Sequence, residues 1–465
     1  MTENRIHQKS ILIISVISSF MATFMGSAVN VALPAMGREF NMDAVLMSWI
    51  ATSFLLAAAV FSLPSGRIAD IIGRKKTMLI GMMIFTFASV MTITAKSTEG
   101  LLWARVIQGL GGPMVFIASS AMLVEAFPKE KRGSVLGISV TAVYIGLSAG
   151  PFLGGVLTHN FGWRTIFVFS IPLGIAALLL MIFSLKGVNQ AYKKGEKFDL
   201  AGFVIYAVSI ISLMYGLTII PEKTGFLSAG AGIAGIILFL FFESKIKFPV
   251  LNVKLFMENR IFLLSNTAVL IHYSATFGTV FFMSLYLQYA KGMTPQQAGA
   301  VIMIQPVLMA LFSSYAGRLS DRVNPGKIAS TGMGVTAAGL GAFVFVGLNT
   351  PVWVIGIILF FTGIGLAFFS SPNTNIIMSS VEKKDYAPAS AVMGTMRLMG
   401  QTTGLALSAM VLSLIIGRSE ITPDRLDDFI KVLKISFSIF AFLCVLGIFA
   451  SLARLKPAGK YRADV

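Results

Sequence analysis

The sequence predicts an all-α membrane protein whose chain crosses the bilayer about fourteen times. Of its 465 residues 56% are hydrophobic and only 12% are charged, and the mean hydropathy is +0.82. Soluble domains carry roughly 25% charged residues, so most side chains of this chain do not face water. A bilayer core of about 30 Å needs roughly 20 apolar residues per helix, and fourteen such spans leave only short connections.

The apolar segments follow one another along the whole chain. The first begins after Arg5 and Lys9 and continues past Val31 without a convincing cleavage site, so we interpret it as a span and not as a signal peptide. The segments lie at roughly 11–35, 45–65, 77–95, 99–126, 133–158, 163–185, 199–220, 225–242, 261–290, 297–316, 327–348, 352–371, 387–416 and 429–453.

Lysine and arginine gather in alternate connections between these segments. If the N-terminus is placed inside, the inner connections and termini hold 26 of the 37 Lys and Arg residues, and the outer connections hold 9. The positive-inside rule then places both termini in the cytoplasm, with the chain in the cytoplasmic (plasma) membrane. This topology accounts for the net charge of +17, so no nucleic-acid partner is expected.

A short motif occurs twice, at corresponding inner connections. Gly66-Arg67-Ile68-Ala69-Asp70 continues through Gly73 and Arg74, and Gly317-Arg318-Leu319-Ser320-Asp321 repeats its beginning. Such internal symmetry predicts two related six-helix bundles, at residues 1–190 and 257–465. Residues 191–256 then hold two additional helices between the bundles.

The repeated acids predict a conformational gate. A carboxylate here can meet a helix N-terminus or a cluster of cations. We expect Asp70 to face the start of the helix after Lys383 and Lys384, and Asp321 to face Lys131, Arg132 and the start of the fifth helix. The alternative is that both loops are topology signals only.

Several motifs, in order and on the expected helices, resemble the major facilitator superfamily and, within it, the fourteen-helix drug:proton antiporters. Gly66–Lys76 resembles the superfamily's inner-loop motif, and Leu102–Gly109 (LWARVIQG) its helix-4 motif, where the resemblance ties Arg105 to proton transfer. Gly146–Gly155 (GLSAGPFLGG) is similar to the antiporters' helix-5 motif. The stretches Asn30–Pro34 and Leu285–Gln288, the latter followed by Gly292, Thr294, Pro295, Ala298 and Gly299, are similar to those of the fourteen-helix group.

The first helix departs from that group at one position. Where the group usually has an aspartate, five residues before Asn30, this chain has Met25. An acid inside a membrane is costly and is normally retained for proton or cation binding. Its replacement weakens the expectation of proton coupling and of cation recognition.

The fifth predicted helix has a stripe of small residues. Gly146, Gly150 and Gly154 share one helix face and allow a neighbouring backbone to approach closely, Gly155 adjoins them, and Pro151 predicts a bend. We interpret the stripe as a packing seam for alternating access, with tight packing alone as the alternative.

Polar groups within the spans supply the candidate functional residues. For proton coupling we consider Arg105, Glu125 and His272, although buried structural roles for Arg105 and His272 remain open. A second group of residues is expected to line a substrate cavity, with interhelical hydrogen bonding as the alternative: Met25, Asn30, Gln108, Gln288, Gln305, Asn373, Asn375 and Arg397.

The expected function is secondary active export of small amphiphilic or drug-like molecules by proton antiport, with two bundles rocking around a midplane site. The first alternative is a carrier of an endogenous metabolite or lipid, neutral or anionic, with altered or no proton coupling. A non-transporting membrane sensor is a further alternative. An enzyme is not expected, because no catalytic pair, nucleotide motif or metal cluster is found, and no cofactor or metal is implied. Small molecules, protons and lipid are the expected partners of a monomer.

Overall fold

The structure is a computed structural model that describes residues 2–185, 198–246, 249–251, 253–382, 386–417 and 419–453. The described residues form helices joined by short connections, and none of them lies in a strand. Residues 186–197, which lead from the first predicted half to the two additional helices, lie outside this description. Lys383 and Lys384, the predicted partners of Asp70, also lie outside the described residues.

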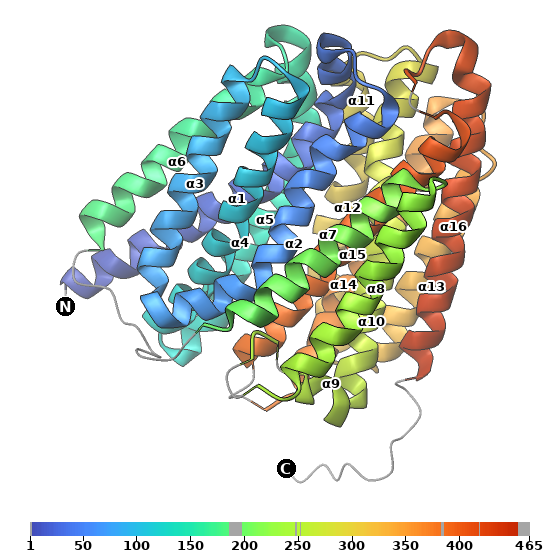
Figure 1. Cartoon of the computed structure of the whole chain (residues 1–465). Coiled ribbons are helices and arrows are strands. Elements are labelled where there is room, and N and C mark those ends of the chain that lie inside the picture. Colours follow the sequence, from blue (N-terminus) through green and yellow to red (C-terminus); the bar gives the residue numbers. More distant parts are fainter. Residues whose placement is uncertain are drawn as a thin grey trace.

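The first half contains six long helices, coloured blue to green in Figure 1. A glycine or a polar cap stands at several of the points where the chain reverses. Gly73, with φ of 98°, joins the second helix to the third, and the Asp43 carboxylate accepts the Leu46 N–H at 2.7 Å. The helices are α1 (Thr2–Phe40), α2 (Ala44–Ile72), α3 (Arg74–Thr94), α4 (Thr98–Ala126), α5 (Lys129–Phe161) and α6 (Arg164–Ser184).

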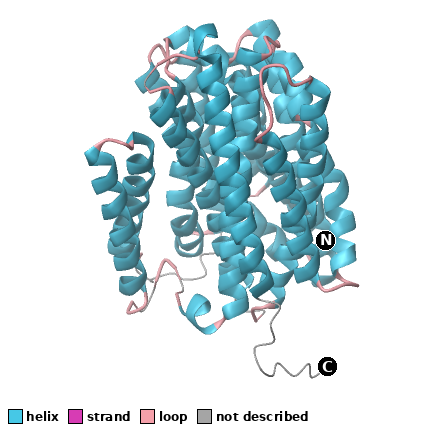
Figure 2. Ribbon diagram, turned by 90° about the vertical axis from the view of Figure 1, so that its right-hand side faces the viewer, coloured by secondary structure: helices cyan, strands magenta, loops and turns pink. Residues whose placement is uncertain are grey.

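The two additional helices form an antiparallel hairpin beside the main bundle (Figures 1 and 2). They are α7 (Leu200–Ile219) and α8 (Lys223–Glu243). α7 contacts both α2 and α15, whereas α8 packs mainly on α7. Glycines set their separation, since a Cβ on Gly216 would lie 2.4 Å from the Ala229 backbone nitrogen.

The second half repeats the pattern with two interruptions. α10 continues into a π turn, η1 (Tyr286–Ala290), and the predicted segment 297–316 is divided at Met303 into α11 and α12. The elements are α9 (Lys254–Glu258), α10 (Arg260–Leu285), α11 (Pro295–Ile302), α12 (Ile304–Ser320), α13 (Pro325–Phe343), α14 (Val352–Ser379), α15 (Tyr386–Ile415), the 3₁₀ turn η3 (Pro423–Arg425) and α16 (Leu426–Ala453).

Thirteen helical spans among the described residues are long and apolar enough to cross a membrane. Each corresponds to one of the fourteen predicted segments; the remaining segment, 327–348, is the shorter α13. α13 is rich in glycine, alanine and threonine because it is packed against α14 and α16. A Cβ on Gly332 would lie 2.6 Å from the Phe368 backbone, which leaves no room for the large side chains of a lipid-facing span.

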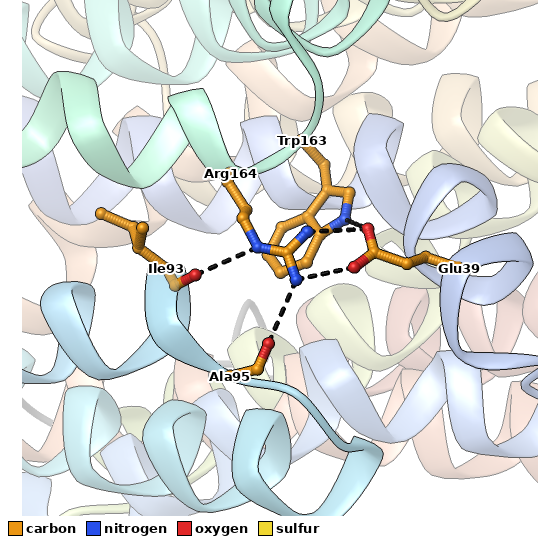
Figure 3. A network of polar contacts seen from close by, with 5 residues as sticks. All are labelled: Glu39, Ile93, Ala95, Trp163 and Arg164. Carbon is orange, nitrogen blue, oxygen red and sulfur yellow. Dashed lines mark hydrogen bonds and ion pairs between the residues drawn. The ribbon is translucent and has the colours of Figure 1, made fainter.

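α1 begins and α16 ends at the same end of the molecule, which we call the terminal end; the opposite end is the far end (Figure 1). At the far end, an ion pair joins three helices of the first half (Figure 3). The Arg164 guanidinium lies 2.6 Å from the Glu39 carboxylate and donates to the carbonyls of Ile93 and Ala95 at 3.0 and 3.1 Å. The Trp163 indole N–H donates to Glu39 at 2.7 Å. α1, α3 and α6 are thus fixed to one another.

Candidate substrate site

Among the described residues, the two halves meet mainly along four helix pairs, which together form the seam. These pairs are α1 with α10, α2 with α15, and α5 with both α11 and α12. Any route between the halves must run along these helices. The polar side chains on the seam are therefore the first candidates for substrate contact.

Near its middle, the seam carries a cluster of hydroxyl groups around one tyrosine. Tyr144, halfway along α5, is hydrogen-bonded to the Ser313 hydroxyl of α12 at 2.9 Å. Tyr273, halfway along α10, is 3.5 Å from the Ser370 hydroxyl of α14. Ser370 and Tyr273 both lie close enough to Tyr144 to interact with its phenol group. One residue of the first half is therefore surrounded by three helices of the second.

Arg397 of α15 adds a cation to this cluster. Its guanidinium acts electrostatically on the Tyr144 hydroxyl, and its buried Nε has no hydrogen-bond partner in the described part of the chain. A small apolar cluster of Met309, Leu366 and Ala367 packs against Tyr144 on the same side. The middle of the seam thus combines a cation, several hydroxyl groups and apolar side chains, a combination suited to an amphiphilic molecule. We call Tyr144, Tyr273, Ser313, Ser370 and Arg397 the central cluster.

Toward the terminal end, the seam is joined by a second hydroxyl pair. The Thr395 hydroxyl of α15 is 3.0 Å from the Ser62 hydroxyl of α2. Thr395 is two residues before Arg397, so α15 contributes both to this hydroxyl pair and to the central cluster. The pair connects the central cluster to the helix that carries the first gate motif.

Toward the far end, the two halves are joined by side-chain hydrogen bonds to backbone carbonyls and by close approach of two backbones. The Ser284 hydroxyl of α10 donates to the Asn30 carbonyl of α1 at 2.6 Å, and the Gln288 amide donates to the Val31 carbonyl at 2.9 Å. A Cβ on Gly155 would lie 2.4 Å from the Pro295 carbonyl oxygen, and one on Gly299 would lie 2.1 Å from that of Pro151. α5 and α11 therefore meet backbone to backbone across the halves.

The glycine stripe of α5 has two different neighbours. Gly146, Gly150 and Gly154 face Thr23, Ser27 and Ala28 of α1, inside the first half. Only the adjoining Gly155, with the carbonyl of Pro151, faces the second half. The predicted packing face is present, but most of it holds one bundle together.

Arg105 is buried inside the first half, with 1% of its surface exposed. Its Nε donates to the Ile50 carbonyl at 3.2 Å, its Nη1 donates to Gln108, and its guanidinium lies 4.5 Å from the centre of the Phe54 ring. The Gln108 amide in turn donates to the Ser89 hydroxyl at 2.9 Å. In the described part of the chain, neutral groups alone bind this cation, which agrees with the structural alternative for Arg105.

The other two coupling candidates lie apart from the central cluster. His272, with 0% of its surface exposed, stacks on Phe369 at 4.0 Å and has Nδ1 3.8 Å from the Cys444 sulfur, inside the second half. Glu125 lies at the terminal end of α4, with 39% of its side chain exposed and its carboxylate 3.2 Å from Arg74 of the first gate motif. Of the three coupling candidates, Glu125 is thus the one that is exposed to solvent.

The remaining predicted cavity residues fall into three places. Asn373 donates to the Ser265 carbonyl at 3.3 Å and Gln305 lies 3.5 Å from Thr362, both within the second half. Met25 of α1 is fully buried in the hydrophobic core. Asn375 lies at the terminal end, 3.2 Å from Ser320 and 3.5 Å from the Asp321 carboxylate, and so belongs to the second gate motif.

Of the predicted cavity residues, Asn30, Gln288 and Arg397 are therefore seen to interact across the seam. Sequence reasoning missed Tyr144, Tyr273, Ser313 and Ser370. The available signal was weak: Tyr144 lies two residues before the glycine stripe, and tyrosines are scarce in this chain, with 10 against 38 phenylalanines.

The family model of the Major Facilitator Superfamily matches residues 15–249 and 266–464. The chain belongs to this superfamily of membrane transporters. It is therefore a multi-pass membrane protein that carries small molecules across the lipid bilayer, and it is not an enzyme.

Relatives of the chain include a riboflavin transporter and two resistance proteins. The chain is 26% identical to the riboflavin transporter RibZ of Clostridioides difficile over 97% of this chain and 98% of the relative. It is 29% identical to the multidrug resistance protein Stp of Mycobacterium tuberculosis, over 86% and 75% of the two chains. A methylenomycin A resistance protein of Bacillus subtilis is 26% identical over 87% and 88%.

Solved structures show the same fold at lower identity. A bacterial homolog of the human lysosomal transporter Spinster superposes with a TM-score of 0.69 at 15% identity, covering 97% of this chain and 98% of that one. The POT family transporter PepTSo gives a TM-score of 0.67 at 14% identity, covering 96% and 97%. The chain therefore shares its fold with these structures.

Proposed function

We propose that the protein is a secondary active exporter of small amphiphilic molecules, working in the plasma membrane by alternating access. The observation that carries this proposal is the central cluster, where hydroxyl groups, apolar side chains and Arg397 from both halves meet in the middle of the seam. The resistance proteins among the relatives support export, and the riboflavin transporter supports an aromatic, polar substrate.

The charge of the seam favours neutral or anionic substrates. Arg397 is a cation with an unpartnered nitrogen, and Met25 stands where the related antiporters have an acid. A carrier of an endogenous neutral or anionic metabolite is therefore the second candidate function. Both candidate functions use the same binding site, and they differ in which molecule that site binds in the cell.

We assign proton coupling to Glu125, whose carboxylate can release Arg74 on protonation. Arg74 belongs to the first gate motif, which also holds Gly66, Arg67, Asp70 and Gly73. Breaking this ion pair would free the loop that controls the terminal end. In the second gate motif, Asp321 corresponds to Asp70, and its carboxylate lies 3.5 Å from the Asn375 amide.

Transport by the purified protein in proteoliposomes tests the proposal. With an imposed pH gradient, we expect uptake of anionic and neutral aromatic amphiphiles into inside-out vesicles, with cationic dyes carried more slowly. Glu125→Gln should reduce gradient-driven flux about tenfold while substrate exchange at equal pH continues, because only proton exchange is lost. Flux of no amphiphile above that of empty liposomes would refute export. An unchanged response of Glu125→Gln to the gradient would exclude its role in coupling.

We further propose that α13 is the fourteenth span and that both termini are cytoplasmic. An even number of crossings is needed when α1 begins and α16 ends at the same end, and thirteen spans without α13 would be odd. Tags at both termini should be protected in right-side-out spheroplasts, and cysteines introduced at Asn349 and Glu420 should be labelled from outside. One accessible terminus would overturn the even count.

A further inference from the structure

Two acidic side chains meet at the terminal end of the α7–α8 hairpin, away from the seam. Asp199 is the N-cap of α7, and its Oδ1 accepts the Gly202 N–H at 3.0 Å. Glu243 is the last residue of α8, and its Oε2 accepts the Leu251 N–H at 3.0 Å. Only 2% of the Glu243 surface is exposed.

The other two carboxyl oxygens face each other. Neither Asp199 Oδ2 nor Glu243 Oε1 has a hydrogen-bond partner in the described part of the chain. Both lie over Gly202: a Cβ there would be 2.2 Å from Asp199 Oδ2 and 2.3 Å from Glu243 Oε1. The two oxygens are therefore no farther apart than the sum of these distances. The glycine leaves room for this encounter, which any larger residue would prevent.

Two carboxylates cannot both be ionised at this separation without a compensating charge. In the described part of the chain, no cation is hydrogen-bonded or ion-paired to either acid, and Asp199 is the one charged group that acts on Glu243. Two ionisable side chains of the hairpin region interact with other groups. Lys245 lies over the Phe241 ring at 4.0 Å, and Tyr206 donates to the Ala59 carbonyl at 3.1 Å. The helices packed on α7 are α2, α8 and α15, and apart from Glu243 their ionisable side chains are Arg67, Asp70, Lys223, Tyr386 and Arg397.

We propose that Asp199 and Glu243 form a proton-binding site, in which one proton is shared between Asp199 Oδ2 and Glu243 Oε1. The proton turns a repulsive contact into an O–H···O⁻ hydrogen bond, which is among the stronger kinds in proteins. Because Glu243 also accepts the N–H of Leu251, the proton ties α7 and α8 to the connection that leads into the second half. Loss of the proton would separate the acids and loosen that connection.

Dicyclohexylcarbodiimide provides a direct test, since the O–H of a protonated carboxyl group in apolar surroundings adds across one of its C=N bonds. In the full-length protein at neutral pH, we expect mass spectrometry to find the adduct at Glu243 or Asp199, and labelling to decline as the pH is raised to about 9. Glu39, which is paired with Arg164, serves as an internal control and should stay unlabelled.

Asp199→Asn separates the proposal from simple burial of Glu243. Asparagine retains the N-cap oxygen and offers an N–H to Glu243, so Glu243 can ionise and its labelling should fall about tenfold. Glu243→Gln should likewise abolish labelling of Asp199, and the thermal midpoint of both variants verifies folding. Absence of any adduct at either acid, or undiminished labelling in Asp199→Asn, would overturn the proposal. Protection by millimolar Na⁺, K⁺ or Mg²⁺ would also overturn it, because the pair would then bind a metal cation.

Discussion

Replacing Gly155 by leucine is expected to abolish transport while leaving each half folded. A Cβ at this position would lie 2.4 Å from the Pro295 carbonyl oxygen and 3.0 Å from the Gln296 Cα, and neither backbone atom can move aside as a flexible side chain would. Since α5 and α11 belong to different halves, the clash is relieved by separating them at the far end. Overpacking of about 1–3 kcal/mol would shift the conformational equilibrium roughly 5- to 150-fold. Substrate flux in proteoliposomes and the thermal midpoint measure the two effects.

Two other glycines of the same helix provide matched controls. A Cβ on Gly137 meets nothing within 4 Å, so Gly137→Leu should transport normally. A Cβ on Gly150 would lie 1.8 Å from the Ser27 hydroxyl, inside the first half, so Gly150→Leu should lower the thermal midpoint itself. Normal flux in Gly155→Leu would mean that the far-end contact does not have to form during transport.

Replacing Arg397 by alanine is expected to reduce the transport of anionic amphiphiles roughly 10- to 150-fold, which corresponds to a charged hydrogen bond of about 1.5–3 kcal/mol. The guanidinium lies in the middle of the seam beside Tyr144 and has an unpartnered Nε, so it can bind a substrate anion. Neutral amphiphiles should be transported at nearly the original rate. Initial rates across a range of substrate concentrations separate a loss of affinity from a loss of turnover.

The conservative variant shows whether charge or geometry matters at this position. Lysine retains the positive charge but not the planar fork, so Arg397→Lys should recover part of the transport of anions. Equal losses for anionic, neutral and cationic amphiphiles in Arg397→Ala would instead assign the residue to packing of α15.

Much of the fold could be predicted because hydropathy and charge act locally along the chain. The two gate motifs, at Gly66 and Gly317, also gave the division into halves. The sequence predicts α13 as an ordinary apolar span, but its composition reflects its helix neighbours more than lipid, and it is less apolar than the thirteen other spans.

The site was harder to predict because a polar residue on a helix does not indicate which neighbour it faces. Gln108 and Arg397 are both polar residues within spans, yet Gln108 supports Arg105 inside one bundle whereas Arg397 faces the other half. Tyr144 was missed because an apolar ring with one hydroxyl group blends into a hydrophobic segment. The Asp199–Glu243 pair was missed because its members are 44 residues apart and meet only when the hairpin forms.

The hydrogen bonds described across the seam join neutral groups: Thr395 with Ser62, Tyr144 with Ser313, Ser284 with the Asn30 carbonyl and Gln288 with the Val31 carbonyl. Each contributes about 0.5–1.5 kcal/mol, and serine and threonine lose little side-chain entropy when they are ordered. Such contacts are not screened by salt, unlike the ion pair of Arg74 with Glu125. Opening and closing of the seam should therefore proceed at similar rates in dilute and in concentrated salt, while control at the terminal end responds to the ionic strength of the surrounding solution.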